Sequence, residues 1–416
     1  MKILWISFYG SWTLPLLYAI KSQNDIHIIV PQINGKDYTQ EKSGIMYYNI
    51  SFREKELLLP MSRKTYKKFQ QVIDKINPDI IHVHGTEKNI AQIQNFQKDI
   101  PIVISIQGIL LGCQQYSYNF LDLKKVHRFR SLKNYLGFGG VKLMNNRIKK
   151  GINYEKDIFR KGQYFIGRTL WDRAYVNLFN PNAIWYNGEE LLRDDFYKSS
   201  NTWNLDECQR HTIFMPSGIN PIKGAHHAIE AVALLKKYYP NVTLHIPGLY
   251  DDTSSNKRLI SPIWGEEYVR FIKHLIKANK LDNNIVFLPR LSAMDMAKKM
   301  QQSHVFLSPS SIDNSPNSIG EAMMIGTPIV STYVGGVPSF LTDESTALLS
   351  PSGDSRMIAF QIKRIFENDI LATNLSKKAH LVALQRHDKE KTAIQYIDIY
   401  TNVINHFKNE SNTFSS

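Results

Sequence analysis

Residues 308–338 read SPSSIDNSPNSIGEAMMIGTPIVSTYVGGVP, and this stretch decides the fold that the sequence predicts. The preceding HVFLSP predicts a buried parallel strand that ends in a loop. A helix should follow, with Ser315 as its N-cap and Pro316 at the first helical position. Gly326 and Pro328 should end this helix after about two turns, and PIVST predicts the next strand. Strand, loop, helix and strand in this order indicate an α/β fold.

The start of this helix is a candidate anion site. The N–H groups of Asn317, Ser318 and Ile319 should point out of the helix at the end of a sheet, which suits a phosphate. Asp313 in the loop and Glu321 on the helix, eight residues apart, place two carboxylates toward one cleft. An acid favoured by the helix dipole explains the same spacing, so the spacing alone leaves both interpretations open.

The stretch resembles the signature of the retaining, nucleotide-sugar-dependent glycosyltransferases of family four, the group 1 glycosyltransferases of the bacterial polysaccharide type. Their pattern is a carboxylate, seven residues and Glu-Ala-Met, followed by Gly-x-Pro and Gly-Gly. Here it reads Asp313, seven residues and Glu321-Ala322-Met323, followed by Gly326-Thr327-Pro328 and Gly335-Gly336. The first carboxylate of the family is usually Glu, and here it is the shorter Asp.

The resemblance implies the α/β GT-B fold, in which two Rossmann-like domains face each other across a cleft. A chain of 416 residues is long enough for two such domains. We expect an acceptor-binding domain over residues 1–198 and a nucleotide-sugar-binding domain over 199–385. Residues 386–416 should form a C-terminal helix that crosses back to the first domain, followed by a disordered tail.

Composition favours a soluble protein of a reducing compartment. Cys113 and Cys208 lie far apart without metal-like spacing and read as free thiols. The N-terminal MKILWISFYG is too short for a signal peptide and reads as a first strand. No run of about 18 apolar residues predicts a membrane span. We therefore expect a cytoplasmic protein.

The positive charge is concentrated in the first half of the chain. Of a net charge of +14, residues 1–200 contribute +12, with 29 Lys and Arg against 17 Asp and Glu. An anionic membrane surface, an anionic glycan or a nucleic acid would each suit this charge, and so would a solvated basic face. No nucleic-acid-binding motif accompanies it.

Four residues of the first half are candidates for the acceptor site. Gly10 follows the first predicted strand, where the family often has a Gly-Gly pair. His84 ends the predicted strand PDIIHVHG, although a histidine there is more often a structural hydrogen-bond partner. Gln107 stands where the family has His; it cannot take a proton but can hydrogen-bond a sugar hydroxyl. Arg168 could meet a phosphate or carboxylate, or form an intrahelical ion pair with Asp172.

The donor site is expected in the second half. The loop SGINPIKG contains Lys223, which the resemblance places at the donor diphosphate, while Gly218 replaces the usual Arg. Arg290 resembles a basic or polar residue near the nucleotide, against the alternative of a surface arginine. Gly335 and Gly336 would let the backbone approach a ligand. The predicted donor-binding residues are Ser217, Gly218, Lys223, Arg290, Asn314, Ser315, Asn317, Ser318 and Glu321.

Residues 121–162 are the most basic part of the chain, with twelve Lys and Arg against three acids. Phe120, Phe129, Tyr135 and Phe138 are interleaved with them. Basic residues with exposed aromatics suit the headgroup layer of an anionic bilayer. We therefore expect peripheral attachment to the inner face of the cell membrane.

The resemblance thus implies transfer of a hexose from a UDP- or GDP-type sugar to a hydroxyl of a glycan acceptor, which we expect to be lipid-linked, as in capsule or other cell-surface polysaccharide synthesis. The resemblance assigns Glu321 to the ribose hydroxyls, Asp313 to the transferred sugar and Lys223 to the diphosphate. A cofactor or metal ion is not expected, because a helix N-terminus and basic side chains can take the leaving charge. The alternatives are a nucleotide-sugar 2-epimerase on the same fold and an inactive glycan-binding protein.

Overall fold

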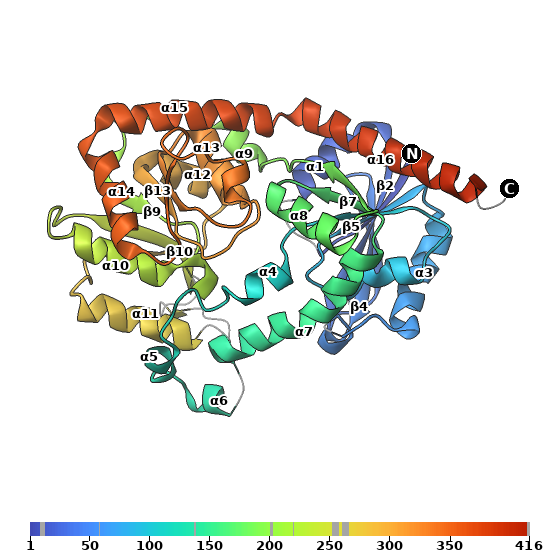
Figure 1. Cartoon of the computed structure of the whole chain (residues 1–416), viewed down its shortest axis with the longest axis horizontal. Helices are drawn as coiled ribbons and strands as arrows, with labels where there is room; N and C mark the ends of the chain where they lie inside the picture. Colours follow the sequence, from blue (N-terminus) through green and yellow to red (C-terminus); the bar gives the residue numbers. More distant parts are fainter. Residues whose placement is uncertain are drawn as a thin grey trace. The chain divides into compact units, whose positions relative to one another are not determined.

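The computed structural model describes residues 1–8, 13–57, 59–136, 139–199, 203–218, 220–251, 258–259 and 266–413 (Figure 1). The chain forms two compact α/β units. The first comprises Met1–Leu111, Arg147–Leu191 and His387–Ser416, and the second comprises Gly112–Asn146 and Leu192–Arg386. Sequence-based boundaries fall at 198 and 385, whereas in the structure residues 112–146, from within the first predicted domain, pack with the second unit.

The first unit is built on an eight-stranded sheet with the order β3-β4-β2-β1-β5-β6-β7-β8. All neighbours are parallel except β3 and β4. The chain starts at β1, runs to one side and then continues from β5 to the other, so the strand order reverses between β1 and β5. The strands are β1 (Lys2–Ile6), β2 (Asp25–Ile33), β3 (Tyr38–Lys42), β4 (Ile45–Phe52), β5 (Ile80–His84), β6 (Ile102–Ser105), β7 (Tyr164–Gly167) and β8 (Ile184–Asn187).

Helices cover both faces of this sheet. Apolar side chains of α3, α7 and α8 form the core on one face, and those of α1 and α16 form it on the other (Figure 1). The helix α3 begins after Ser62, whose hydroxyl accepts the Thr65 N–H, as the capping pattern predicts. The helices are α1 (Leu14–Ile20), η1 (Lys21–Gln23), α2 (Glu54–Leu57), α3 (Arg63–Ile76), η2 (Asn89–Asn95), α4 (Leu110–Gln114), α7 (Gly140–Lys161), α8 (Leu170–Phe179) and α16 (Lys389–Thr413).

The C-terminal helix α16 is fastened to the first unit by polar contacts inside its apolar interface. Tyr400 is fully buried, and its hydroxyl accepts the Trp5 indole N–H at 3.1 Å. The same hydroxyl lies 2.7 Å from His82 Nδ1, while His82 Nε2 lies 2.6 Å from Ser105 Oγ. Since burial lowers the pKa of His82, the ring is neutral and hydrogen-bonds both hydroxyl groups. The return of the last helix to the first unit is therefore confirmed.

The second unit is built on a seven-stranded sheet with the order β11-β10-β9-β13-β14-β15, and β12 also pairs with β10. Only β11 is antiparallel to its neighbour. The strand order reverses between β9 and β13, which is where open α/β sheets bind ligands. The strands are β9 (Gln209–Phe214), β10 (Thr243–Asp251), β11 (Arg258–Leu259), β12 (Ile285–Pro289), β13 (Ser303–Ser308), β14 (Ile329–Thr332) and β15 (Leu348–Ser350).

The helices of the second unit share one large apolar core with this sheet. Asp354 caps α14 by accepting the N–H groups of Arg356 and Met357. The helices are α9 (Asp194–Lys198), η3 (Pro221–Lys223), α10 (Ala225–Leu235), α11 (Glu266–Ala278), α12 (Ala293–Gln302), α13 (Asn317–Ile325), η4 (Val337–Ser339), α14 (Ser355–Glu367) and α15 (Asp369–Arg386).

The segment 112–146 joins the second unit through a buried carboxylate. It contains two short helices, α5 (Leu123–His127) and α6 (Leu132–Tyr135). Glu267 of α11 has a side chain that is 1% exposed, and it accepts from Arg130 Nε at 3.1 Å and pairs with His127 Nδ1 at 2.7 Å. The Val141 N–H also donates to this carboxylate. These contacts fix the position of the segment against α11, because loss of one partner would leave the buried carboxylate without its full set of bonds.

Replacing Tyr400 by Phe should destabilise the first unit by about 1–3 kcal/mol, because the Trp5 N–H and His82 then lose their buried partner. Chemical unfolding of the wild-type and variant proteins measures this difference. Tyr18→Phe is the control: Tyr18 of α1 is 43% exposed, so its hydroxyl can bond to water and a smaller loss is expected. Equal stability of Tyr400→Phe and the wild type would contradict the role of Tyr400.

Candidate functional site

The loops after β9 and β13 bring together two of the predicted catalytic residues. Lys223 Nζ donates to Asp313 Oδ2 at 2.6 Å, and both side chains remain partly exposed. Lys223 ends η3, and Asp313 lies in the loop between β13 and α13. Because β9 and β13 are adjacent parallel strands, residues that are 90 positions apart meet at one edge of the sheet.

Local backbone geometry holds Lys223 in place. The Asn220 side chain accepts the Ile222 N–H and caps η3. Gly224 follows with φ of +77°, and a Cβ at this position would lie 2.1 Å from the Pro309 carbonyl oxygen. Only glycine therefore permits this contact between the two loops.

The pair Gly335-Gly336 lies against the backbone of Asp313. Gly335 has φ of +49°, and a Cβ there would lie 2.1 Å from the Asp313 carbonyl oxygen. The Gly336 N–H donates to the same oxygen at 3.0 Å. The glycines thus let the chain approach the backbone of Asp313, and their approach to a ligand stays a prediction.

The helix α13 begins one residue later than predicted, since Ser315 was the expected N-cap and Pro316 the expected first helical residue. Pro316, with ψ of 117°, occupies the cap position, and the first helical residue is Asn317. The predicted capping role of Ser315 is therefore wrong: its hydroxyl accepts from Arg386 Nη2 at 3.1 Å. The Ile319 N–H donates to the Pro316 carbonyl, so it does not point outward as predicted. The predicted end at Gly326, with φ of +89°, is confirmed.

Glu321 forms an ion pair that sequence patterns did not reveal. Its carboxylate accepts from Arg193 Nε at 2.7 Å and from Arg193 Nη2 at 2.9 Å. The Glu321 side chain is 5% exposed and that of Arg193 is 26% exposed. Burial raises the pKa of Glu321, and the bonds from Arg193 oppose this rise. Arg193 carries no motif, and its partner is 128 residues away.

The remaining predicted donor residues lie around these loops. Gly218 is buried, and a Cβ there would lie 2.7 Å from Ile246 Cγ2, so the space of the family's arginine is filled. Asn314 is buried, whereas Ser217, Asn317 and Ser318 are partly exposed. Arg290 is exposed after β12, which pairs with β10 on the side of β9 away from β13.

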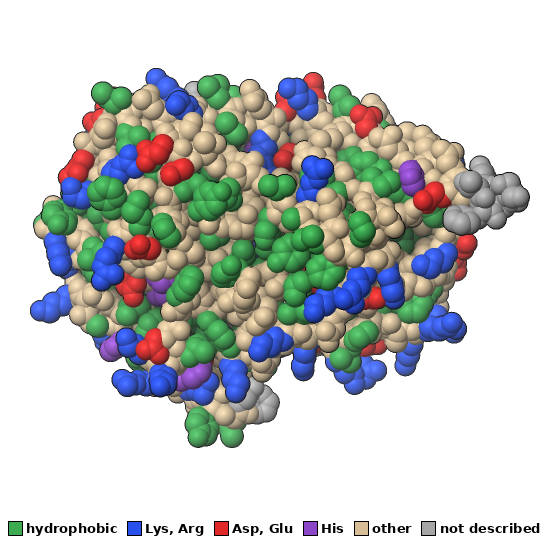
Figure 2. Space-filling model, viewed as in Figure 1, with side chains coloured by type: hydrophobic (Ala, Val, Ile, Leu, Met, Phe, Trp, Pro, Cys, Tyr) green, Lys and Arg blue, Asp and Glu red, His purple; other side chains and the backbone are tan. Residues whose placement is uncertain are grey.

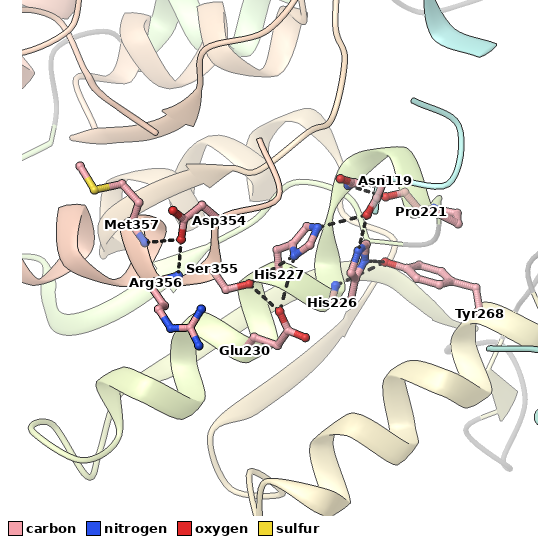
Figure 3. A network of polar contacts seen from close by, with 10 residues as sticks. All are labelled: Asn119, Pro221, His226, His227, Glu230, Tyr268, Asp354, Ser355, Arg356 and Met357. Atoms are coloured by element: carbon pink, nitrogen blue, oxygen red, sulfur yellow. Dashed lines mark hydrogen bonds and ion pairs between the residues drawn. The ribbon is translucent and has the colours of Figure 1, made fainter. Parts of the chain in front are cut away.

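A buried polar network supports the Lys223 loop (Figure 3). The side-chain amide of Asn119 donates to the Pro221 carbonyl at 2.8 Å. The backbone carbonyl oxygen of Asn119 is 2.9 Å from His226 Nε2 and 3.2 Å from His227 Nε2. His226 Nδ1 in turn lies 2.8 Å from the Tyr268 hydroxyl. Burial lowers the pKa of His226 to about 3, so its ring is neutral and Nε2 donates to Asn119. The segment 112–146 thereby holds the loop that carries Lys223.

In the first unit, two of the predicted acceptor residues come together. Arg168 Nη2 donates to Gln107 Oε1 at 3.3 Å, and Arg168 Nη1 pairs with Glu190 Oε2 at 2.6 Å. Asp172, the alternative partner, accepts the backbone N–H of Arg168 and the Trp185 indole N–H with its carboxylate. Gly10 lies outside the described residues.

His84 is buried at the carboxyl end of β5, with its ring 4.3 Å from that of Trp5 and 3.9 Å from that of His82. Burial lowers the pKa of His84 to about 3. At neutral pH the imidazole is therefore uncharged. It can exchange hydrogen bonds with a neutral group but is not a source of positive charge for an anion.

Two carboxyl groups at the same sheet edge were missed in the sequence. Glu87 lies over the backbone of two glycines, because a Cβ on Gly85 or Gly108 would be 2.6 or 2.9 Å from its oxygens. Glu155 of α7 accepts the N–H groups of Leu110 and Leu111. Burial raises the pKa of both acids, that of Glu155 to about 8. A glutamate two residues after the glycine that follows β5 was the available signal for Glu87.

The described residues contain neither a metal-ligand cluster nor a membrane-spanning helix. Within the described residues, no group of three or more His, Cys, Asp or Glu side chains is arranged to hold a metal ion. Among the helices described, none combines the length and the apolar character needed to cross a bilayer.

Comparisons with known proteins agree with this architecture. The model of the family "Glycosyl transferases group 1" matches residues 201–382, and that of "Glycosyl transferase 4-like" matches residues 2–115. Both families are glycosyltransferases, and the two matches fall in different halves of the chain. The chain is thus similar to glycosyltransferases over both halves, and its two α/β units have the GT-B fold.

A curated relative is the lipopolysaccharide core biosynthesis glycosyltransferase LpsE of Rhizobium meliloti, 29% identical over 177 residues, or 42% of this chain and 46% of the relative. Two other curated relatives, N-acetyl-alpha-D-glucosaminyl L-malate synthase of Bacillus anthracis and D-inositol 3-phosphate glycosyltransferase of Saccharomonospora viridis, are matched over 37% and 42% of their length. Among solved structures, sucrose-phosphate synthase of Thermosynechococcus elongatus has a TM-score of 0.72 at 17% identity, covering 98% of this chain and all of that one. HepE of Anabaena, solved with UDP-glucose, has a TM-score of 0.65 at 16% identity, covering 97% of this chain and all of that one. These two structures establish the fold alone.

Replacing His226 by Gln should make folding less sensitive to acid. The pKa of His226 is about 3 in the folded protein and about 6.5 in an unfolded chain. Its contribution to stability is therefore complete above pH 6.5 and is lost as the pH falls toward 3, by about 1.4 kcal/mol per pH unit. Urea unfolding at pH 7, 6 and 5 should show a shallower loss in the variant. Identical slopes in both proteins would show that folding does not lower the pKa of His226.

Proposed function

We propose that the protein is a retaining glycosyltransferase that moves a hexose from a nucleotide diphosphate sugar to a hydroxyl of a glycan acceptor. The observation that carries this proposal is the contact between Lys223 and Asp313 beside the start of α13. It places a cation, a carboxylate and a helix N-terminus at the strand reversal of the second unit. The diphosphate of a nucleotide sugar is anionic, so it suits a cation and a helix N-terminus. The sugar is uncharged, and its hydroxyl groups can donate to a carboxylate.

Lys223 and the start of α13 would bind the diphosphate. The helix dipole favours an anion at this end, and Lys223 supplies a full positive charge. As the sugar leaves, negative charge builds up on the diphosphate, so groups already aimed at it lower the barrier. This arrangement supports transfer without a metal ion and without a cofactor. Asn314, Ser315, Asn317 and Ser318 lie at the same place along the chain and would contribute further polar contacts.

Asp313 and Glu321 would divide the rest of the donor between them. Asp313 is partly exposed beside Lys223, so it can accept from a hydroxyl of the transferred sugar once Lys223 moves to the phosphate. Glu321 is more deeply buried on α13 and would accept from the ribose hydroxyls. The family models and the UDP-glucose bound by HepE support a nucleotide-sugar donor, and the name of LpsE supports a cell-surface glycan as the product.

A panel of UDP- and GDP-sugars, assayed with and without a lipid-linked glycan acceptor, tests the proposal. Nucleotide release that depends on the acceptor, with the donor's anomeric configuration kept in the product by NMR, supports a retaining transferase. Release of an epimerised sugar nucleotide would indicate a 2-epimerase, and binding without turnover an inactive glycan-binding protein. Activity that persists in a chelator supports the metal-free reaction, and its loss would overturn that part.

Replacing Asp313 by Asn should keep nucleotide affinity within about fivefold, because partly exposed ion pairs contribute about 0–1 kcal/mol. Turnover should fall by about a hundredfold or more, since charge at the sugar changes in the transition state. Calorimetry with the free nucleotide and initial rates with the sugar nucleotide measure the two effects. Asp313→Glu, which restores the residue usual in the family, should remain active. Full turnover of Asp313→Asn would reduce this acid to a partner of Lys223.

We also propose that the protein works at the inner face of the cell membrane on a lipid-linked acceptor. In the structure the excess positive charge is shared by the two units, with 24 Lys and Arg against 18 acids in the first and 27 against 19 in the second. The predicted asymmetry between domains is therefore not present. The charge is local instead: residues 112–146 hold six Lys and Arg against one acid.

The surface offered to the membrane differs from the predicted one. Phe129 packs inward, with its ring 6.0 Å from Phe271 and 5.0 Å from His274, and Arg130 is bound to Glu267. Phe138 lies outside the described residues. Apolar side chains gather instead over α6, with lysines and arginines beside them (Figure 2). These are Leu132, Tyr135 and Leu136, which are 77%, 79% and 65% exposed.

Such a pairing of apolar and basic side chains suits an anionic bilayer. The apolar side chains of α6 can enter the headgroup layer, and the exposed Lys124, Lys125 and Arg128 next to them along the chain can bind lipid phosphates. Each cation near the surface contributes about 1 kcal/mol.

The triple variant Lys124→Gln, Lys125→Gln and Arg128→Gln should bind phosphatidylglycerol vesicles about a hundredfold more weakly at physiological salt. Sedimentation with vesicles measures this affinity. Nucleotide binding should remain, since none of these residues lies in the donor site. Equal sedimentation of variant and wild type would refute the membrane proposal and favour a soluble glycan acceptor.

Controls separate general charge from this surface. Arg356, Lys377 and Lys378 are exposed elsewhere in the second unit, and their replacement by Gln removes the same charge but should leave vesicle binding nearly unchanged. Replacing the three apolar residues of α6 by Ser should weaken binding at high salt as well, because salt does not screen apolar burial.

A further inference from the structure

Arg193 stands at a particular place in the chain. The chain passes from the first unit to the second between Leu191 and Leu192, and Arg193 follows at once as the residue before α9. Its guanidinium lies 5.0 Å from the ring of Phe196 and binds Glu321 through two nitrogens. Its position is therefore set by the aromatic ring on one side and by the carboxylate on the other.

The two bonds leave part of the Glu321 carboxylate available. A carboxylate has about four acceptor positions, and Arg193 takes one on each oxygen. One position remains on each oxygen, at a spacing that suits two neighbouring hydroxyl groups. A guanidinium bound in this way also prevents the carboxylate from rotating about its last side-chain bond.

The charge of Glu321 depends on the same contact. Burial raises the pKa of this carboxyl group and Arg193 opposes the rise. Without Arg193, the rise caused by burial would be unopposed, and the pKa of Glu321 would lie higher. A protonated carboxyl group donates one hydrogen bond and no longer accepts charge-assisted bonds from two hydroxyls.

We propose that Arg193 is a positioning residue for donor binding, which keeps Glu321 ionised and oriented so that its two oxygens accept from the vicinal hydroxyls of the nucleotide's ribose. This rests on the proposed function, in which Glu321 binds the donor. The proposal adds a residue outside the family signature. It also makes ribose recognition depend on the chain crossing at Leu191 and Leu192, which is one of the crossings between the two units.

The test compares wild type, Arg193→Gln and Glu321→Gln by calorimetry with the free nucleotide that the wild type binds, between pH 7.0 and 8.5. At pH 7.0 Arg193→Gln should bind about tenfold or more weakly. Relative to the wild type at the same pH, its affinity should recover as the pH rises, because Glu321 then loses its proton. Glu321→Gln should be weak at every pH. Arg193→Lys, which keeps the charge but not the paired geometry, should fall between wild type and Arg193→Gln.

A second measurement reports the hydroxyl contact itself. The wild type should prefer the ribonucleotide to its 2′-deoxy analogue by about tenfold or more, and Arg193→Gln should lose most of this preference at pH 7.0. Arg210→Gln is the matched control, because Arg210 forms a paired contact with Asp369 at the surface of the same unit. It should keep both the affinity and the preference.

The outcomes are distinct. Wild-type affinity of Arg193→Gln at all pH values, or a loss that does not change with pH, overturns the role of Arg193 while leaving the proposed function in place. Failure of the wild type to bind any UDP or GDP nucleotide would instead overturn the proposed function. If Arg193→Gln does not fold, the same comparison is made with Arg193→Lys, whose weakened preference for the ribonucleotide is then the deciding result.

Discussion

The pairing of β9 with β13 is the constraint on which the candidate donor site depends. The two parallel strands are hydrogen-bonded in a fixed register, with Phe214 opposite Phe306, so their following loops leave the sheet side by side. Lys223 meets Asp313 for this reason, and the close backbone contacts at Gly224 and Gly335 hold the loops together. A site built in this way is formed before a ligand arrives, which favours electrostatic catalysis because little reorganisation is needed during the reaction.

Buried charge in both units is accompanied by opposite charge. Glu321 has Arg193, Glu267 has Arg130, and Arg168 has Glu190. Such pairs add little net stability, but removing one partner leaves an unpaired buried charge that costs several kcal/mol. Their main effect is geometric, since each partner fixes the orientation of the other at the end of a sheet. The Arg193 pair thereby links the state of Glu321 to the segment that joins the units.

The segment 112–146 connects two features of the second unit. At one end Asn119 holds the loop of Lys223 through its amide and its carbonyl group. Further along, α6 exposes the apolar side chains that we assign to the membrane. Between them, Arg130 fastens the segment to Glu267 of α11. The proposed membrane surface and the diphosphate loop are therefore held by one continuous piece of chain.

The sequence by itself determined the class of fold and the strand and helix succession around residues 308–338, and its resemblance to a family singled out Lys223, Asp313 and Glu321, whose roles stay predictions. These follow from local periodicity, capping and turn chemistry, and from a motif whose spacing is preserved along the chain. The tertiary structure decided the partners. Arg193 meets Glu321, and Glu190 meets Arg168, only because topology and strand register bring distant segments together. It also decided that residues 112–146 join the second unit and that Phe129 points inward, since the burial of one face of a short helix depends on what packs against it.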